Sequence, residues 1–259
     1  AAAMWPSIWS STSTQAMSSQ RQCVSATVLA DGRVLGTGGS RVENQTIDVN
    51  NTAEIWNPAT GQWTQGTAGV NARLYHSGAL LLPDARVIIL GGGAPAPVTN
   101  LNAEMYTPPY LYSGAGTALA ARPGIVSAPD TFTAGQSFTV GFSSGSGVSR
   151  VTLVKTGSTT HSNNMDQRFI DLPFTASGAT LTVTPPSNPA VIPPGYYMLF
   201  VLNGNGVPSV ARMVRSNITV TQNPPSDTTA AIGGGGGGPF ALACGTNEVL
   251  VGVGGSTAT

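Results

Sequence analysis

The chain has 259 residues, which is enough for one large or two medium-sized domains with hydrophobic cores. Its formal net charge is zero and only 8% of its residues are charged, against about 25% in an average protein. Without a run of basic residues, nucleic-acid binding driven by electrostatics is excluded.

Short apolar runs separated by glycine and proline follow one another along the whole chain, which contains 33 glycines and 19 prolines. No window has the pattern of a long amphipathic helix, and none has the roughly 18 continuous apolar residues of a membrane span. The sequence therefore predicts an all-β protein. Its clearest strands are expected at residues 26–29, 33–35, 86–90, 137–142, 150–154 and 196–202.

Residues 1–19 form an N-terminal segment in which no signal peptide is visible, so we expect either that one has been removed or that the chain begins inside a larger protein. Residues 20–115 then contain an internal repeat with a period of about 52 residues. Cys23–Gly39 aligns with Tyr75–Gly93, and each copy reads strand, Asp-centred turn, strand and glycine run, followed by a strand with an aromatic residue.

Four short strands in about 50 residues, with a Gly-Gly after the second strand, indicate a kelch blade of a β-propeller. Two blades cannot close a propeller, which needs about four to eight. We therefore expect their open sides to be covered by an N-terminal propeller region or by other subunits, because uncovered strand edges and apolar faces favour aggregation.

From residue 122 to residue 222 the rhythm changes to about seven short strands with frequent turns, the pattern of an immunoglobulin-like sandwich. Residues 223–239 are a Pro/Gly linker, and residues 240–259 carry one further predicted strand, which could join a neighbouring sheet and so support self-assembly. Cys23 and Cys244 are free to pair with each other, to pair outside the chain or to remain thiols, and their number does not decide between these.

The chain has two histidines, His76 beside Tyr75 and His161 in a polar segment about 85 residues later. Imidazole is the commonest protein ligand of copper, zinc and iron, and the neighbouring phenol of Tyr75 offers an oxygen donor. On spacing alone, two histidines are more commonly ordinary polar surface residues than metal ligands.

Several motifs together resemble the C-terminal part of the galactose oxidase and glyoxal oxidase family of copper radical oxidases. They run in the same order along residues 20–222: Tyr75-His-Ser, Gly91-Gly-Gly, Tyr106-Thr-Pro-Pro-Tyr, Thr160-His-Ser, Asp166-Gln-Arg and Gly206-Val-Pro-Ser. The resemblance implies two kelch blades followed by an immunoglobulin-like E-set domain. It also implies copper bound by Tyr75, His76 and His161.

In this resemblance Tyr75 is the axial phenol and the base for the substrate hydroxyl, while His76 and His161 are equatorial ligands. The family's radical tyrosine and the cysteine linked to it belong to earlier blades. Cys23 stands at the position that corresponds to Tyr75 in the preceding blade and does not match that cysteine. Arg73 and Arg168 are read either as lining a substrate pocket or as ties between loops.

Two functions follow. The first is the C-terminal portion of a secreted copper oxidase that converts a primary alcohol, aldehyde or carbohydrate substrate with O₂ into oxidised product and hydrogen peroxide, inactive without the earlier blades. The second is a non-catalytic extracellular protein that forms filaments or binds carbohydrate, favoured by low charge and richness in Gly, Ser and Thr. Fold alone does not separate them.

Overall fold

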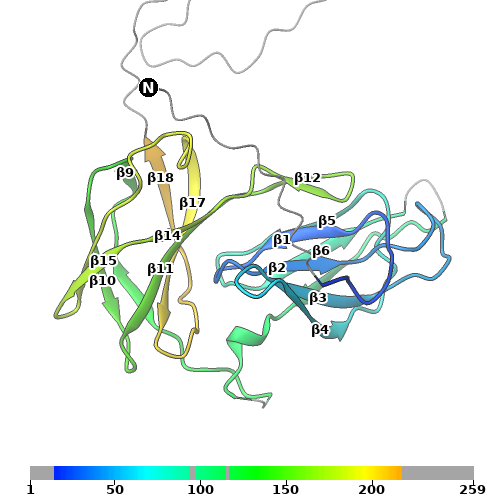
Figure 1. The fold of residues 1–259 in the computed structure, drawn as a ribbon, viewed down its shortest axis with the longest axis horizontal. Coiled ribbons are helices and arrows are strands. Elements are labelled where there is room, and N and C mark those ends of the chain that lie inside the picture. The colour runs from blue at the N-terminus through cyan, green and yellow to red at the C-terminus, as the bar shows by residue number, and fades with distance from the viewer. Residues whose placement is uncertain (1–14, 94–96, 115–116, 218–259) are drawn as a thin grey trace, which may run out of the picture. The chain divides into compact units, whose positions relative to one another are not determined.

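A computed structural model describes residues 15–93, 97–114 and 117–217 (Figure 1). The predicted linker, the C-terminal strand and Cys244 lie outside these ranges. The described chain is built almost entirely of β-strands, so the predicted fold class is confirmed. No helix in these ranges is long and apolar enough to cross a membrane.

The first blade is a four-stranded antiparallel sheet in sequential order. Its strands are β1 (Ser25–Val28), β2 (Val34–Thr37), β3 (Thr52–Asn57) and β4 (Gln62–Ala68). The second blade contains three strands within the described residues, where the repeat predicts four. They are β5 (Ser77–Leu81), β6 (Val87–Gly91) and β7 (Ala103–Tyr106). After β7, Pro108 and Pro109 remove two backbone donors, and the chain turns into the short 3₁₀ helix η1 (Pro109–Leu111).

An arginine and a glutamate are paired at the same place in each blade. Arg21 is bonded to Glu54 of β3 and donates to the Gly38 carbonyl at 3.2 Å. Arg73 is bonded to Glu104 of β7 at 2.7 Å. Each guanidinium thereby joins the end of its blade's second strand to the third strand. Arg73 thus ties the end of β6 to β7.

The two blades stack face to face. Thr27, Leu35 and Ile55 lie opposite one another on β1, β2 and β3 and are buried. The Thr27 hydroxyl donates to the Ala79 carbonyl of β5 at 3.3 Å. Ala79, Val87 and Ile89 of the second blade join the same hydrophobic core. One face of the first blade is thus covered by the second.

Within the part of the chain that the structure describes, no comparable neighbour covers the equivalent face of the second blade. The first two strands of each blade form a hairpin, and the last strand pair before the turn is Val28–Val34 in the first blade and Leu81–Val87 in the second. Counted from these pairs, the residues of the second blade that correspond to the buried Thr27, Leu35 and Ile55 are Leu80, Ile88 and Met105. Leu80 and Ile88 are only partly buried, and Met105 is 42% exposed. We call the apolar surface of these three residues and Leu90 the open blade face.

The remaining described strands form a sandwich of two sheets with its own apolar core. One sheet has the order β15-β16-β10-β8 and the other β14-β11-β17-β18-β9. The strands are β8 (Gly124–Ser127), β9 (Thr131–Thr133), β10 (Phe138–Ser143), β11 (Val148–Lys155), β14 (Phe169–Leu172), β15 (Phe174–Ser177), β16 (Thr180–Val183), β17 (Gly195–Asn203) and β18 (Arg212–Asn217). In this range the structure has nine sandwich strands, where the sequence predicts about seven.

Both blade hairpins dock on the sandwich through backbone carbonyls at their turns. The carbonyl of Asp31 accepts from Arg150 at 2.8 Å, and the carbonyl of Asp84 accepts from Arg122 at 2.9 Å. Apolar residues of the blades share one core with Val154, Met198, Phe200 and Leu202 of the sandwich. The sandwich is therefore attached to both blades, and a loop that extends from it can contact them.

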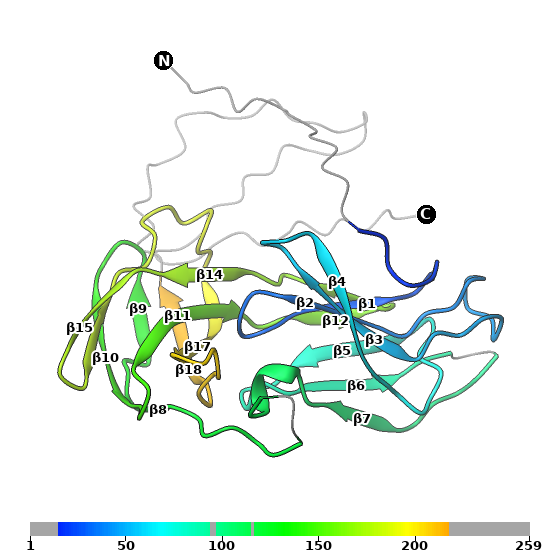
Figure 2. The same ribbon diagram turned by 60° about the horizontal axis from the view of Figure 1, so that its bottom comes forward.

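That loop is the hairpin of β12 (Ser158–Thr160) and β13 (Asn163–Met165). It extends the paired strands β11 and β14 and contacts the inner strands β1 and β5 (Figures 1 and 2). Figure 2 shows β12 beside these two strands from a second direction.

Candidate metal centre

Tyr75 and His76 are the central residues of a β-turn that leads into β5. The Ser77 N–H donates to the Leu74 carbonyl at 3.0 Å, which closes the turn. His76 has a φ of 64°, the left-handed conformation required at the third position of a type II turn. The Gly93 N–H donates to the Tyr75 carbonyl at 2.6 Å, so the glycine run wraps around the outside of the turn.

His161 lies at the tip of the β12–β13 hairpin. It and Ser162 form the two-residue loop, and both have positive φ values, 54° and 64°. This is the pattern of a type I′ turn, a position where Asn-Gly is the usual pair. Left-handed backbone costs a residue other than glycine about 1–2 kcal/mol. Three of these strained residues, His76, His161 and Ser162, therefore lie within two facing turns.

Polar side chains hold the hairpin against the inner strands of both blades. The Ser162 hydroxyl donates to the Leu74 carbonyl at 3.0 Å, and the amide of Asn164 donates to the Ala79 carbonyl at 2.9 Å. Gln167 accepts from the Val28 N–H at 2.7 Å and donates to the carbonyl of Ala26 at 2.9 Å. At the base of the hairpin, the ammonium of the buried Lys155 pairs with Asp166. Together these bonds fix where His161 lies.

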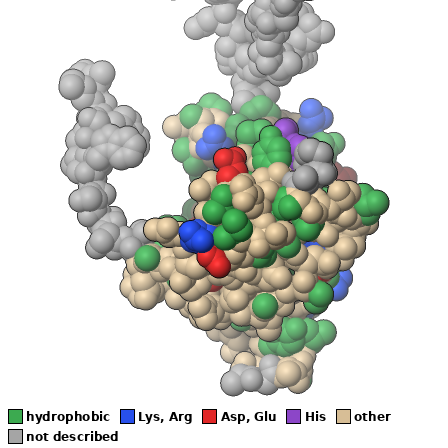
Figure 3. Space-filling model, turned by 90° about the vertical axis from the view of Figure 1, so that its right-hand side faces the viewer, with side chains coloured by type: hydrophobic (Ala, Val, Ile, Leu, Met, Phe, Trp, Pro, Cys, Tyr) green, Lys and Arg blue, Asp and Glu red, His purple; other side chains and the backbone are tan. Residues whose placement is uncertain are grey.

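The three residues singled out from the sequence are brought together. The ring centroids of His76 and His161 are 4.7 Å apart, and the ring centroid of Tyr75 lies 4.1 Å from the first and 5.2 Å from the second. Both histidines are exposed and Tyr75 is half-buried. The histidine side chains, purple in Figure 3, reach the surface side by side.

The spacing of the two imidazole rings is compatible with one shared metal ion. A metal about 2 Å from an imidazole nitrogen lies about 3 Å from the ring centroid, so two centroids 4.7 Å apart can share an ion at roughly right angles. The Thr160 hydroxyl lies 2.5 Å from Nδ1 of His161 and orients that ring. Among the described residues there is no group of three His, Cys, Asp or Glu side chains that could hold a metal. A third protein donor beside the two imidazoles would therefore have to be of another kind, and the phenol of Tyr75 is the neighbouring candidate.

Arg168 is exposed and is the residue directly before β14; its carbonyl accepts from the Lys155 N–H at 2.9 Å. Cys23 is half-buried, and no disulfide joins it to another described residue. Its φ of 58° matches the left-handed His76, which shifts the expected correspondence with Tyr75 by one residue.

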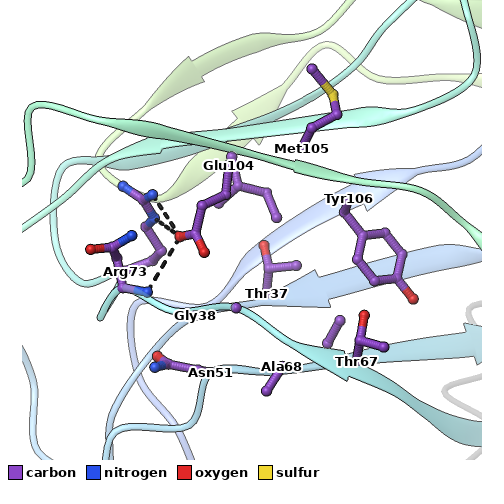
Figure 4. A pocket seen from close by; sticks show the side chains of 13 residues that line it. Thr37, Gly38, Asn51, Thr67, Ala68, Arg73, Glu104, Met105 and Tyr106 are labelled. Atoms are coloured by element: carbon purple, nitrogen blue, oxygen red, sulfur yellow. Dashed lines mark hydrogen bonds and ion pairs between the residues drawn. The ribbon is translucent and has the colours of Figure 1, made fainter.

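A separate pocket of about 120 Å³ with a mixed polar and apolar lining lies between the two blades, and none of the three site residues lines it (Figure 4). Arg73 and Glu104 are paired on its wall. Burial tends to raise the pKa of Glu104, but hydrogen bonds from the Val70 N–H and from Arg73 outweigh it and hold the pKa below its usual value. The position of Arg73 here agrees with a structural role.

The described chain joins two blades to an immunoglobulin-like sandwich, and a hairpin of the sandwich carries His161 to the turn of Tyr75 and His76. Residues 122–216 match the galactose oxidase-like, Early set domain family. Galactose oxidase of Gibberella zeae is 40% identical over 199 residues, which are 73% of this chain and 28% of that protein.

The aldehyde oxidase GLOX of Vitis pseudoreticulata is 36% identical over 166 residues, covering 58% of this chain and 31% of that protein. A solved structure of a fungal alcohol oxidase of the AA5 family, in complex with copper, matches with a TM-score of 0.74 and 32% identity, over 79% of this chain and 44% of that one. The chain thus resembles the C-terminal part of the galactose oxidase and glyoxal oxidase family, and it spans less than a third of the length of these two curated relatives.

Ser162 and Gln167 stand in motifs that carry the family resemblance, but the sequence assigned no docking role to them or to Asn164. The available signal was the unbroken polar run around His161, in which every side chain from Thr159 to Asn164 can make a hydrogen bond. Its carbonyl partners belong to elements far away in the chain.

Proposed function

We propose that this chain is the C-terminal portion of a secreted copper radical oxidase, in which Tyr75, His76 and His161 bind the copper ion. The observation that carries the proposal is the meeting of three donor rings, supplied by two strained turns whose histidines are about 85 residues apart. Left-handed residues other than glycine are uncommon and gather at functional sites. The copper-containing structural relative supports the choice of metal.

The proposed reaction removes two electrons and two protons from a primary alcohol or an aldehyde hydrate and gives them to O₂, which yields the oxidised product and hydrogen peroxide. Bound copper supplies a Lewis acid and one electron equivalent at this site. The Tyr75 oxygen accepts the proton of the substrate hydroxyl, and the two imidazoles fix the orientation of the phenol relative to substrate. The exposed positions of His76 and His161 leave one side of the site accessible.

The second electron equivalent requires another redox group, which the resemblance assigns to a tyrosine of earlier blades. The open blade face supports the presence of a further blade, because the corresponding residues of the first blade are buried against the second blade. The 28% coverage of galactose oxidase supports the same view. We infer that the 259-residue chain alone has no alcohol oxidase activity.

We further infer that residues 20–115 form the two blades, that residues 122–222 form the E-set domain, and that the protein acts outside the cell. The low charge and the similarity to galactose oxidase support this location. Residues 223–239 and 240–259 remain a predicted linker and a predicted strand segment.

The test is a titration of the purified chain with Cu(II), followed by electron paramagnetic resonance and by absorption from the phenolate–copper pair. We expect one Cu(II) per chain with nitrogen hyperfine coupling, loss of the absorption band in Tyr75→Phe, and at least about tenfold weaker binding in His161→Gln. Ser177→Ala, on an exposed sandwich strand, is the control.

Copper binding that His161→Gln leaves unchanged would overturn the site. Peroxide formation by the loaded chain with galactose, glyoxal or a simple primary alcohol would overturn the inference of inactivity. No copper binding, together with ordered self-association in solution, would favour the non-catalytic extracellular alternative.

A further inference from the structure

The two turns that carry the site residues are joined directly by Ser162. Its N–H donates to the Ser77 carbonyl at 3.0 Å, and its hydroxyl donates to the Leu74 carbonyl at 3.0 Å. The hydroxyl oxygens of Ser77 and Ser162 are 3.3 Å apart. Leu74 and Ser77 are the first and last residues of the turn that contains Tyr75 and His76. The tip of the β12–β13 hairpin is therefore hydrogen-bonded to the first and last residues of the facing turn.

The choice of serine at this position is informative. At a φ of 64°, glycine would adopt the conformation with less strain, yet the chain places a buried serine there. A buried serine in a left-handed conformation, with a hydrogen bond to the opposite turn, is best explained by what that bond holds in place.

We propose that Ser162 is a positioning residue that sets the distance between the two turns before copper binds. It would thereby hold the side chains of His161, Tyr75 and His76 close enough to bind the same copper ion. This inference rests on the proposed copper site. Residues that orient metal ligands without touching the metal change metal affinity by about 10–100-fold when they are replaced.

Ser162→Gly is the decisive variant, since it removes the hydroxyl and tolerates the left-handed backbone. The matched control is Asn164→Ala, which removes a 2.9 Å bond between the same hairpin and the same blade but keeps the hydroxyl bond between the two turns; the bond from the backbone N–H of residue 162 to the Ser77 carbonyl is present in both variants. We expect the affinity of the full chain for Cu(II) to fall about 10–100-fold in Ser162→Gly and by less than about threefold in Asn164→Ala. We also expect the copper hyperfine splitting to change in Ser162→Gly alone.

The outcomes separate the two proposals. If the wild-type chain does not bind Cu(II), the copper site fails and this inference fails with it. If the wild-type chain binds but Ser162→Gly matches it in affinity and spectrum, or if Asn164→Ala causes the same loss, only the positioning role is overturned. If Ser162→Gly does not fold, Ser162→Ala is measured in its place, and failure of both to fold would overturn the inference because the role is then structural.

Discussion

Replacing Glu54 and Glu104 with glutamine, one at a time, separates the effect of burial from the effect of pairing. The two carboxylates occupy equivalent places in the blades, opposite Gly36 of β2 and Ile89 of β6, and each is bonded to the arginine that precedes its blade. Their environments differ. The Glu54 side chain is 1% exposed, whereas that of Glu104 is 23% exposed.

Glu54→Gln leaves the guanidinium of Arg21 charged and without a counter-ion in a site that water does not reach. Desolvation by burial already lowers the pKa of Arg21, which shows how poorly this site supports the charge. Breaking a buried ion pair costs about 3–5 kcal/mol. Arg21 keeps the carbonyl of Thr52 at 3.0 Å as an acceptor, so we expect the lower end of this range. Glu104→Gln should cost less, about 1–2 kcal/mol, because water reaches Glu104 and because Arg73, although only 4% exposed, keeps the carbonyls of Gly91 and Asn102 as acceptors.

The assay is urea unfolding of the full chain followed by tryptophan fluorescence, from which the free energy of unfolding is extrapolated for wild type and both variants. Arg73→Lys, which keeps a charge but loses the planar fork, serves as a check that the Glu104 result reflects the ion pair. Equal losses in the two glutamine variants, or a loss below about 1 kcal/mol in Glu54→Gln, would refute the reasoning from burial.

Three further outcomes follow from the blades and the glycine run. Ile55→Ala should lower the free energy of unfolding by about 2–5 kcal/mol and the equivalent Met105→Ala by less than about 1 kcal/mol, since Ile55 is 3% and Met105 42% exposed; equal losses in urea unfolding would mean that the open blade face is covered. The pKa of Glu104 is lowered in the folded chain, so the contribution of this carboxylate to stability is present above its unfolded pKa near 4.5 and is lost as the pH falls through the folded pKa. Glu104→Gln should therefore flatten that part of the curve of stability against pH, and a curve equal to that of wild type would contradict this prediction. Gly92→Ala should destabilise the chain by more than about 1 kcal/mol and weaken Cu(II) binding, because φ is +112° and the new Cβ would lie 3.1 Å from the Leu74 nitrogen; a melting temperature and Cu(II) affinity equal to wild type would show that this turn adapts.

The sequence predicts the strands well wherever a local pattern decides them. β1 was expected at 26–29 and spans Ser25–Val28, and the strand expected at 196–202 is β17, Gly195–Asn203. Alternating or continuous β-branched residues, closed by Asp-centred turns, carry this information within a few residues. The missing fourth strand of the second blade was mispredicted because the repeat was extended through Pro108 and Pro109, which cannot donate to a sheet.

The candidate site was only partly within reach of the sequence. Tyr75, His76 and His161 were found from residue type and family resemblance, and no local pattern places them together. The residues that dock the hairpin depend on bonds between groups 85 and 88 residues apart, such as those from Ser162 to Ser77 and to Leu74. Their partners are backbone carbonyls, which every residue has and which no sequence signal distinguishes.

The strained turns of the site depend on the contact between blades and sandwich. Left-handed backbone at His76, His161 and Ser162 carries a cost of about 1–2 kcal/mol per residue. It is offset when the hairpin docks, and the hairpin docks because the sandwich that carries it is fixed to both blades through their turn carbonyls and through the shared apolar core. Neither part alone would hold the three rings within about 5 Å of one another. A site divided between two regions in this way exists only in the docked state, so its geometry depends as much on the blade–sandwich contact as on the residues that face the metal.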